Sequence, residues 1–365
     1  MEQANERSKR VKRTVDVKFL KERKIWYNNP RFLRKLVQYG FLITIILIGI
    51  QFGLWYSYYA SGGKLFQVSR PAGVEGFLPL SGLISLKYWL LSGTLSKIHP
   101  SSVVLLLAIL AVSLVFKKSF CGFICPVGLI SEWFWKLSRK VFGKRASAPW
   151  GWRVNKFIDY PLRSIKYLLL FFFVNAILIA MNEQALKAFI EMPYNKVADA
   201  KMLLFFGSLT SFSFGVLILL AVGSLFITNF WCRYLCPYGA LLGLVSFLSP
   251  VKIKRNIPTC TDCKACTRVC PAMIKVHKET RVHSDECIGC LDCVAACPVP
   301  KTLYPEVAFV KKRVTARGFI IGVLGIFMAF YITARMTGYW DNNISSDEYM
   351  FHIQKINDPE YNHFR

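Results

Sequence analysis

The sequence predicts an all-α integral membrane protein that carries a small α+β insert. Three observations support this fold class. Hydrophobic residues make up 54% of the 365 residues and charged residues only 19%, a balance more apolar than that of soluble domains. Five segments approach the roughly 20 apolar residues that a membrane-spanning helix needs. Finally, 12 cysteines gather in short clusters, which is the distribution of metal ligands rather than of a disulfide scaffold.

The apolar segments divide the chain into spans and connecting stretches. A weaker segment, Gly76–Leu95, contains Pro79 and Lys87 and favours an interfacial or re-entrant helix. We expect a basic segment 1–35 without the apolar core of a signal peptide, a four-span domain 36–255, an insert 256–310, a fifth span 317–336 and a tail 337–365. The five predicted spans are Leu36–Tyr59, Ser101–Phe116, Ile165–Met181, Phe212–Phe230 and Phe319–Ala334.

The formal net charge of +26 follows this topology. If the N-terminus is cytoplasmic, 37 of the 47 Lys and Arg residues fall on the inner side. That is the positive-inside bias that orients membrane proteins. We therefore predict a bacterial inner-membrane protein whose N-terminus and insert are cytoplasmic and whose C-terminus is periplasmic. A lipid surface explains the basic balance, so no nucleic-acid partner is expected.

An internal repeat links two segments that are 111 residues apart. Ala111–Gly128 reads AVSLVFKKSFCGFICPVG and Val222–Gly239 reads VGSLFITNFWCRYLCPYG. Each copy is the end of a span followed by Cys-x3-Cys-Pro-x-Gly, and one predicted span lies between them. Both copies therefore run in the same direction, which indicates a parallel repeat and places all four cysteines at the cytoplasmic membrane face.

The polar insert carries two Cys-x2-Cys-x2-Cys-x3-Cys-Pro runs, the pattern of bacterial two-cluster ferredoxins. In that pattern the fourth cysteine of each run binds the other cluster. Structural zinc is the alternative, but two complete runs with a trailing proline are specific. About 50 residues cannot fold unaided, so two [4Fe–4S] clusters would stabilise the insert. The predicted ligands are Cys260, Cys263, Cys266 and Cys297 for one cluster and Cys287, Cys290, Cys293 and Cys270 for the other.

The two Cys-x3-Cys pairs predict a further metal centre. Pro126 and Pro237 indicate that a helix begins just after each pair, and a strand-like or turn approach would aim both sulfurs at its N-terminus, which favours thiolates. A shared metal centre, of iron–sulfur type, is the preferred interpretation. Transient copper binding, a redox dithiol and buried structural thiols remain alternatives. The four predicted ligands are Cys121, Cys125, Cys232 and Cys236.

Other side chains carry weaker signals. None of the 5 histidines lies within a predicted span, so haem is not expected. His99 reads as a span-boundary residue, and His277 and His283 as surface residues. The outer loop from Arg70 to Pro79 is either a structural turn or part of a quinone or partner site. No nucleotide-binding or catalytic motif stands out, so no catalytic residue is assigned.

With these motifs in place, the chain resembles the membrane-bound polyferredoxins of the NapH/NosR/CcoG type over roughly residues 36–310. The resemblance is most specific at FCGFICPVG, at FWCRYLCPYGALLG and at the paired cluster runs. It shows neither the N-terminal flavin-binding domain of the NosR type nor the C-terminal β-sandwich of the CcoG type. The resemblance is therefore closest to the NapH-like members.

The resemblance implies an electron-transfer module of a respiratory chain. Electrons would pass through the clusters between quinone, or a cytoplasmic carrier such as ferredoxin or flavodoxin, and a membrane or periplasmic partner such as a reductase subunit. Whether the chain acts as an enzyme of the quinol dehydrogenase kind is left open. The alternative is a maturation factor that reduces or delivers a metal such as copper to a respiratory enzyme.

Overall fold

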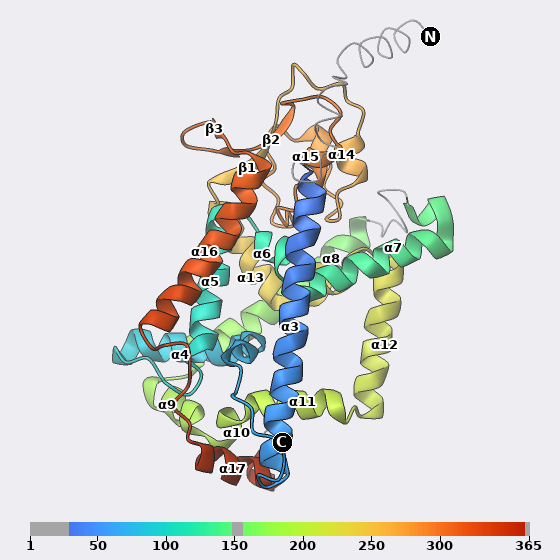
Figure 1. The fold of residues 1–365 in the computed structure, drawn as a ribbon. Coiled ribbons are helices and arrows are strands. Elements are labelled where there is room, and N and C mark those ends of the chain that lie inside the picture. Colours follow the sequence, from blue (N-terminus) through green and yellow to red (C-terminus); the bar gives the residue numbers. More distant parts are fainter. Residues whose placement is uncertain (1–28, 148–155, 362–365) are drawn as a thin grey trace, which may run out of the picture. The chain divides into compact units, whose positions relative to one another are not determined.

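A computed structural model describes residues 29–147 and 156–361. Most of the predicted basic segment 1–35 and the last four residues of the tail lie outside the described residues. The chain divides into two compact units, each built from three segments, and the elements are labelled in Figure 1. Unit 1 comprises Met1–Leu42, Leu110–Leu170 and Ile218–Gly325, and unit 2 comprises Ile43–Ile109, Phe171–Leu217 and Ile326–Arg365.

Three helices in the described part of the chain are long and apolar enough to cross a membrane. They are α3 (Pro30–Ala60), α8 (Lys156–Val174) with its π-helical continuation η3 (Asn175–Ala180), and α16 (Ala316–Met336). A fourth span is possible if α11 (Ala198–Gly207) and α12 (Ser211–Phe226), which meet at an 80° bend, cross the membrane together.

The remaining predicted span is a shorter helix. Helix α5 (Pro100–Phe116) covers the expected segment but has 17 residues, so the described residues support three to four spans and the five-span topology stays a prediction. The segment Gly76–Leu95 contains α4 (Pro79–Ser92), whose 14 residues are too few to span a bilayer.

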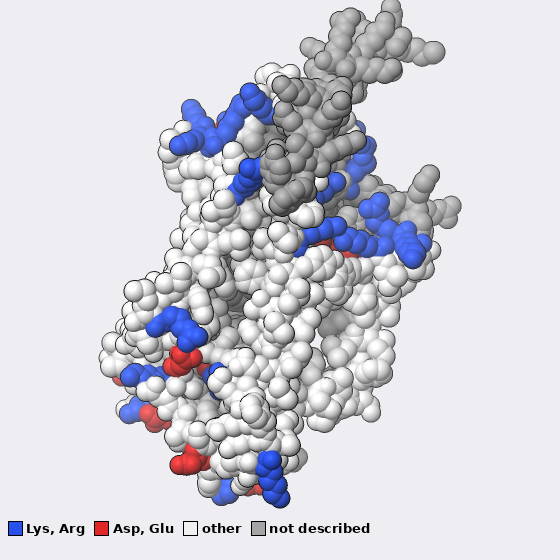
Figure 2. All heavy atoms as spheres, in the orientation of Figure 1, with Lys and Arg blue, Asp and Glu red and all other residues white. Residues whose placement is uncertain are grey.

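Uncharged side chains cover the long helices. No charged residue occurs between Lys35 and Lys64, so almost the whole of α3 offers an apolar surface. In Figure 2 most of the length of α3 and α12 is white, and charged side chains gather near helix ends and connecting segments. This is the surface that a lipid environment requires.

Unit 1 contains all twelve cysteines. Short helices α6 (Ser119–Phe123) and η4 (Trp231–Leu235) lead into α7 (Pro126–Ser147) and α13 (Pro237–Val245), and η5 (Ser246–Leu248) ends α13. An antiparallel sheet of order β1-β2-β3 follows, in which Val251 pairs with Val307. Its strands are β1 (Val251–Arg255), β2 (Leu303–Val307) and β3 (Lys312–Arg313), and the cysteine runs between them form α14 (Ala265–Arg268), η6 (Val276–Lys278) and α15 (Asp292–Ala296).

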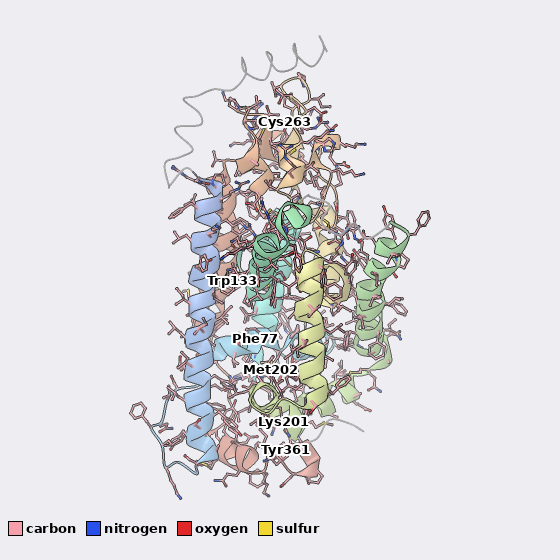
Figure 3. All side chains as sticks on the ribbon, turned by 90° about the vertical axis from the view of Figure 1, so that its right-hand side faces the viewer. Phe77, Trp133, Lys201, Met202, Cys263 and Tyr361 are labelled. Atoms are coloured by element: carbon pink, nitrogen blue, oxygen red, sulfur yellow. The ribbon has the colours of Figure 1, made fainter. Side chains whose placement is uncertain are left out.

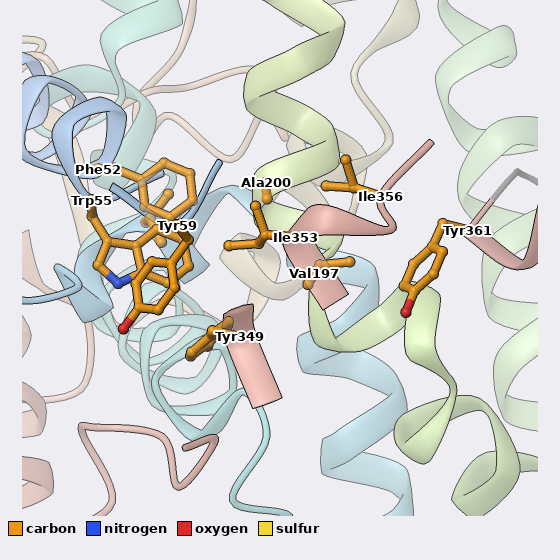
Figure 4. Packing of buried hydrophobic residues seen from close by; sticks show 10 residues of the cluster. Phe52, Trp55, Tyr59, Val197, Ala200, Tyr349, Ile353, Ile356 and Tyr361 are labelled. Carbon is orange, nitrogen blue, oxygen red and sulfur yellow. The ribbon is translucent and has the colours of Figure 1, made fainter. Parts of the chain in front are cut away.

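Unit 2 has an aromatic core. Trp55 of α3 stacks on Phe52 and meets Tyr349 edge-on at a centroid distance of 4.8 Å. Ile353 belongs to the same buried cluster, which Figure 4 shows. Helix α4 packs against α9. The other elements of this unit are η2 (Ala72–Phe77), α9 (Glu183–Glu191), α10 (Pro193–Lys196), α17 (Ser346–Gln354) and η7 (Pro359–Tyr361).

Candidate iron–sulfur site

Eight cysteines line two small cavities in unit 1. Cys260, Cys263, Cys266 and Cys297 line what we call the first cavity, and Figure 3 labels Cys263 in the loop before α14. Cys270, Cys287, Cys290 and Cys293 line what we call the second cavity. In each cavity three cysteines come from one run and the fourth comes from the other run, so the grouping matches the two predicted ligand sets.

The backbone of the two runs curls in the same way. Asp262 and Gly289, each just before the second cysteine of its run, have φ angles of 51° and 60°. Lys264 and Leu291, each just after the second cysteine, have φ angles of 58° and 60°. Non-glycine residues visit this left-handed region rarely. Because both runs adopt this left-handed conformation at equivalent positions, both loops turn around their cavities and several sulfurs of each run point to one place.

Burial makes these thiols hard to ionise unless a cation is bound. It raises the pKa of Cys270 to about 12, despite hydrogen bonds from the backbone of Ile274 and Ala272. It raises the pKa of Cys290 and Cys293 further above the ordinary range. Metal binding deprotonates such thiols and supplies the missing positive charge. The donor set is all sulfur, which suits iron–sulfur chemistry. Among the described residues no group of three or more His, Cys, Asp or Glu is close enough to bind a single metal ion.

The four predicted ligands of the third centre also come together, because the charges of these cysteines act on one another. Helices α7 and α13 begin at Pro126 and Pro237, which confirms the predicted helix starts. Of the expected strand-like or turn approach, the strand-like form is wrong, because Cys121 lies in helix α6 and Cys232 in the π-helix η4. A turn at Ile124 precedes Cys125. At Cys236 the chain is extended, with φ −76° and ψ 104°, as expected before a proline.

Each second cysteine of a pair meets backbone N–H groups of the following helix. The Cys236 sulfur accepts a hydrogen bond from the Gly239 N–H at 3.2 Å. Burial raises the pKa of Cys125, and hydrogen bonds from the backbone N–H groups of Gly128 and Val127 oppose this rise. An N-terminal helix dipole with free N–H groups favours a thiolate. These N–H groups would stabilise a thiolate at both sulfurs, but burial outweighs them and raises the pKa of Cys125 and Cys236 overall.

The four sulfurs, which we call the Cys-x3-Cys set, influence one another electrostatically. Burial raises the pKa of Cys232, and the nearby thiolates of Cys125, Cys121 and Cys236 raise it further. The Lys118 ammonium opposes this rise at both Cys232 and Cys121. Four half-buried thiols at one place cannot all be thiolates without a cation. The set therefore either stays partly protonated or binds a metal.

Lys118 belongs to a buried charge network beside this set. Its ammonium lies 3.8 Å from the carboxylate of Glu286, which also receives a hydrogen bond from Lys166. Glu286 directly precedes Cys287. Lys118, Lys166 and Glu286 are all at least 94% buried, so they interact in a medium where screening by water is weak. The network joins the Cys-x3-Cys set to the loop of the second cavity.

Another buried cation, Arg34, extends from helix α3. The Arg34 guanidinium donates to the Gly122 carbonyl at 2.9 Å and to Asp292 at 2.9 Å, and it also pairs with Glu132. Gly122 lies between the two cysteines of the first pair, and Asp292 lies between Cys290 and Cys293. Arg34 therefore ties helix α3 to both cysteine motifs.

Sequence reasoning did not identify Arg34, Lys118 or Glu286 as site residues. Lys118 lies next to a motif cysteine and Glu286 precedes another, but adjacency in sequence does not reveal that they pair. In unit 2 the expected boundary residue His99 is buried, with its ring 3.2 Å from the Glu75 carboxylate. Glu75 also meets Arg70 at 2.9 Å. The predicted outer loop is thus held in place by the contacts of Glu75 with Arg70 and His99.

Two family models match the cysteine-bearing segments. A model described as a 4Fe-4S binding domain matches residues 98–145 and again 209–256, so each match contains one Cys-x3-Cys pair. A model described as a 4Fe-4S dicluster domain matches residues 252–298, which contain both ferredoxin-type runs. The match to these models agrees with the cysteine chemistry of the two cavities.

Curated relatives cover most of the chain. YccM of Escherichia coli (strain K12), which is named as a candidate electron transport protein, is 41% identical over 88% of this chain and 90% of its own length. The ferredoxin-type protein NapH of Haemophilus influenzae is 28% identical over 74% of this chain and 88% of its own length. The regulatory protein NosR of Pseudomonas aeruginosa is 30% identical over 48% of this chain and 23% of its own length. No solved structure matches the chain.

Proposed function

The chain belongs to the NapH/NosR-type family of membrane-bound polyferredoxins, and on that basis we propose that it relays electrons across the cytoplasmic face of a bacterial inner membrane. Two [4Fe–4S] clusters and a third centre would carry the electrons. The relay would run between quinone, or a cytoplasmic carrier, and a membrane or periplasmic redox partner.

One observation carries this proposal: each of two cavities is lined by four cysteines drawn from both runs. We assign Cys260, Cys263, Cys266 and Cys297 to one cluster and Cys270, Cys287, Cys290 and Cys293 to the other. The clusters would supply one-electron redox chemistry when bound. The protein contributes burial, backbone hydrogen bonds and nearby charge, which are the means by which a protein sets a cluster's potential.

The third centre is proposed at the Cys-x3-Cys set. Support comes from the electrostatic influence that its four sulfurs have on one another and from the 4Fe-4S binding model that matches both segments. Two of the sulfurs meet helix N-terminal N–H groups, which stabilise anionic centres. Iron–sulfur ligation is preferred to copper because the same chain already directs eight thiolates to cluster-type cavities.

Iron counting tests the assignment. Anaerobically purified wild type should hold more iron than two cubanes require, and Cys121→Ser or Cys232→Ser should lower the count to that of two cubanes. Cys263→Ser and Cys290→Ser should each remove one cubane and its absorption near 400 nm. Iron equal to two cubanes in the wild type and in both set variants would refute the third centre. Zinc in place of iron would refute the clusters.

The other function to be tested is a maturation factor that reduces or delivers a metal such as copper. An electron-transfer subunit should oxidise or reduce a quinol analogue in vesicles and co-purify with its partner enzyme. A maturation factor should do neither, and its loss should leave a respiratory enzyme made but metal-poor. The buried charges around the set favour the electron-transfer function, because a closed, charge-compensated site suits a resident centre better than a cargo.

The surface near the first cavity suits an acidic electron carrier. Arg255 and Lys264 line that cavity and give it two basic side chains. A carrier of the ferredoxin or flavodoxin type would be attracted by this charge, so its reaction rate should fall steeply between 10 mM and 300 mM salt, on the order of ten-fold or more. A rate that is independent of salt would exclude such steering.

A further inference from the structure

The first Cys-x3-Cys segment makes close backbone contact with the loop of the second cavity. A Cβ atom at Gly122 would overlap the carbonyl oxygen of Ile288, and Cys290 Cα lies 3.7 Å from the same position. A Cβ atom at Gly289 would in turn come within 2.6 Å of the Ser119 hydroxyl and 3.1 Å of the Phe116 carbonyl oxygen. Glycine on each side therefore permits an approach that a side chain would block.

The second Cys-x3-Cys segment reaches the same cavity from its other end. The Asn229 amide donates to the carbonyl of Pro271 at 3.3 Å, and the Arg233 guanidinium donates to the carbonyl of Ala272 at 3.4 Å. Pro271 and Ala272 directly follow Cys270, the cysteine that the first run contributes to the second cavity.

The two repeats carry different residues at the equivalent position that contacts the second cavity, and each residue suits its neighbours. Gly122 corresponds to Arg233 when the repeats are aligned. The Arg233 side chain has room because it pairs with Asp159, at 2.7 Å and 3.0 Å. At Gly122 the space is filled by the cavity loop instead. Each repeat thus uses the same position for its own contact.

From these contacts, and resting on the proposed function, we infer an order for the centres: the second cavity is the inner one, docked on the Cys-x3-Cys set, and the first cavity is the outer one. Gly122 and Asn229 are positioning residues for this docking. The residues that line the first cavity all lie between Arg255 and Leu303 and include the basic side chains of Arg255 and Lys264.

The buried charges support the same order. Lys118 meets Glu286, which precedes Cys287, at 3.8 Å, and Arg34 meets Asp292, which precedes Cys293, at 2.9 Å. Both carboxylates flank cysteines of the second cavity. The cations that stand beside the Cys-x3-Cys set therefore also stand beside the inner cavity, so a change in charge at one should be felt at the other.

The test uses the full chain, purified anaerobically in detergent, and two variants. Gly122→Ala inserts one methyl group between the segment and Ile288. Asn229→Gly removes only the amide contact, because the φ of 56° at Asn229 is one that glycine adopts without strain. Gly325→Ala is the matched control, since nothing lies within 4 Å of a Cβ at that position. Cys263→Ser and Cys290→Ser identify which EPR signal belongs to which cavity.

We expect Gly122→Ala and Asn229→Gly to shift the midpoint potential or line shape of the Cys290-dependent signal. The Cys263-dependent signal should be unchanged, and Gly325→Ala should change neither. Hydrogen exchange gives a second readout that needs no assignment of signals. Asn229→Gly should speed exchange of amides in 284–292 and 270–274 by about five-fold, the factor for one lost hydrogen bond, and leave 259–266 unchanged.

Several results separate this inference from the proposed function. If the Cys263-dependent signal responds, or both respond equally, the order is wrong although the clusters are present. If the wild type carries no clusters, the proposed function fails, and the exchange experiment alone decides the docking. Equal exchange changes around both cavities, or none, would overturn it. Should Gly122→Ala not accumulate, Asn229→Gly decides.

Discussion

The ion pair between Arg34 and Glu132 offers a quantitative test of the site's construction. The side chains of Arg34 and Glu132 are 4% and 9% exposed, and Arg34 has further contacts to Asp292 and Gly122. Removing one partner of such a buried pair typically costs about 3–5 kcal/mol, because the other charge is left buried and unpaired. We therefore expect Arg34→Gln to lower the free energy of unfolding by that amount.

A double-mutant cycle isolates the pair itself. Arg34→Gln, Glu132→Gln and the double variant should give a coupling energy of about 2–3 kcal/mol, the upper part of the range for residues in one network. The matched control is the pair of Arg335 and Asp341, whose N–O distance is 3.0 Å but whose side chains are 53% and 64% exposed. Its coupling should stay below about 1 kcal/mol.

The assay is reversible unfolding in mixed detergent micelles, followed by tryptophan fluorescence, with loss of the 400 nm absorption recorded in parallel. Trp133 of α7 lies next to Glu132 in sequence and is labelled in Figure 3. Equal coupling in the buried and the exposed pair would refute the argument that burial gives this contact its strength. Loss of absorption without loss of stability would instead assign Arg34 a role in cluster retention alone.

Three further predictions concern other parts of the chain. Gly289→Ala should remove about half of the cubane iron, because φ is 60° and Ser119 is close, while Gly338→Ala, with φ 73° and nothing within 4 Å, should keep it. Burial alone would raise the pKa of Glu306, but hydrogen bonds and ion pairs with Lys254 and Arg281 lower it overall. The Glu306 carboxylate therefore stabilises the fold at pH values above its unfolded pKa, and this stabilisation is lost as the pH falls through the lower folded pKa. Glu306→Gln should accordingly make amide hydrogen exchange in β2 less dependent on pH in the acid range. The Ser345 hydroxyl caps α17 by accepting a hydrogen bond from the Glu348 N–H at 3.2 Å. Ser345→Ala removes this cap and should destabilise the helix by about 1 kcal/mol, which would be seen as faster proteolysis at 346–354.

The cysteine groupings and helix starts could be predicted because they depend on local pattern. A proline after each Cys-x3-Cys pair sets the start of α7 and of α13, since proline is accepted in the first turn of a helix. The approach to each pair was expected to be strand-like or a turn, and the strand-like form is wrong. Proline restricts only the residue before it, so Cys236 is extended while Trp231–Leu235 remains helical.

The charge networks could not be predicted from local pattern. Lys166 and Glu286 are 120 residues apart and meet only in the folded chain. In unit 2, His99 directly precedes α5, as expected of a span-boundary residue, but its burial between Glu75 and the Asn195 carbonyl was not foreseen. A single sequence shows which residues are charged but not which distant carboxylate each will meet. The Lys and Arg residues counted toward membrane orientation thus include several, such as Arg34, that are inside the protein.

The exchange of one cysteine between the two runs has a consequence for biosynthesis. The first cavity needs Cys297 and the second needs Cys287, Cys290 and Cys293 together with Cys270. Neither cavity can therefore close while the ribosome is still translating the first run. Both become complete within one short stretch of synthesis, after α12 has been made and before α16 emerges. The insert must accordingly mature as one event, and a chain cut anywhere between the runs would leave two incomplete halves rather than one working cluster.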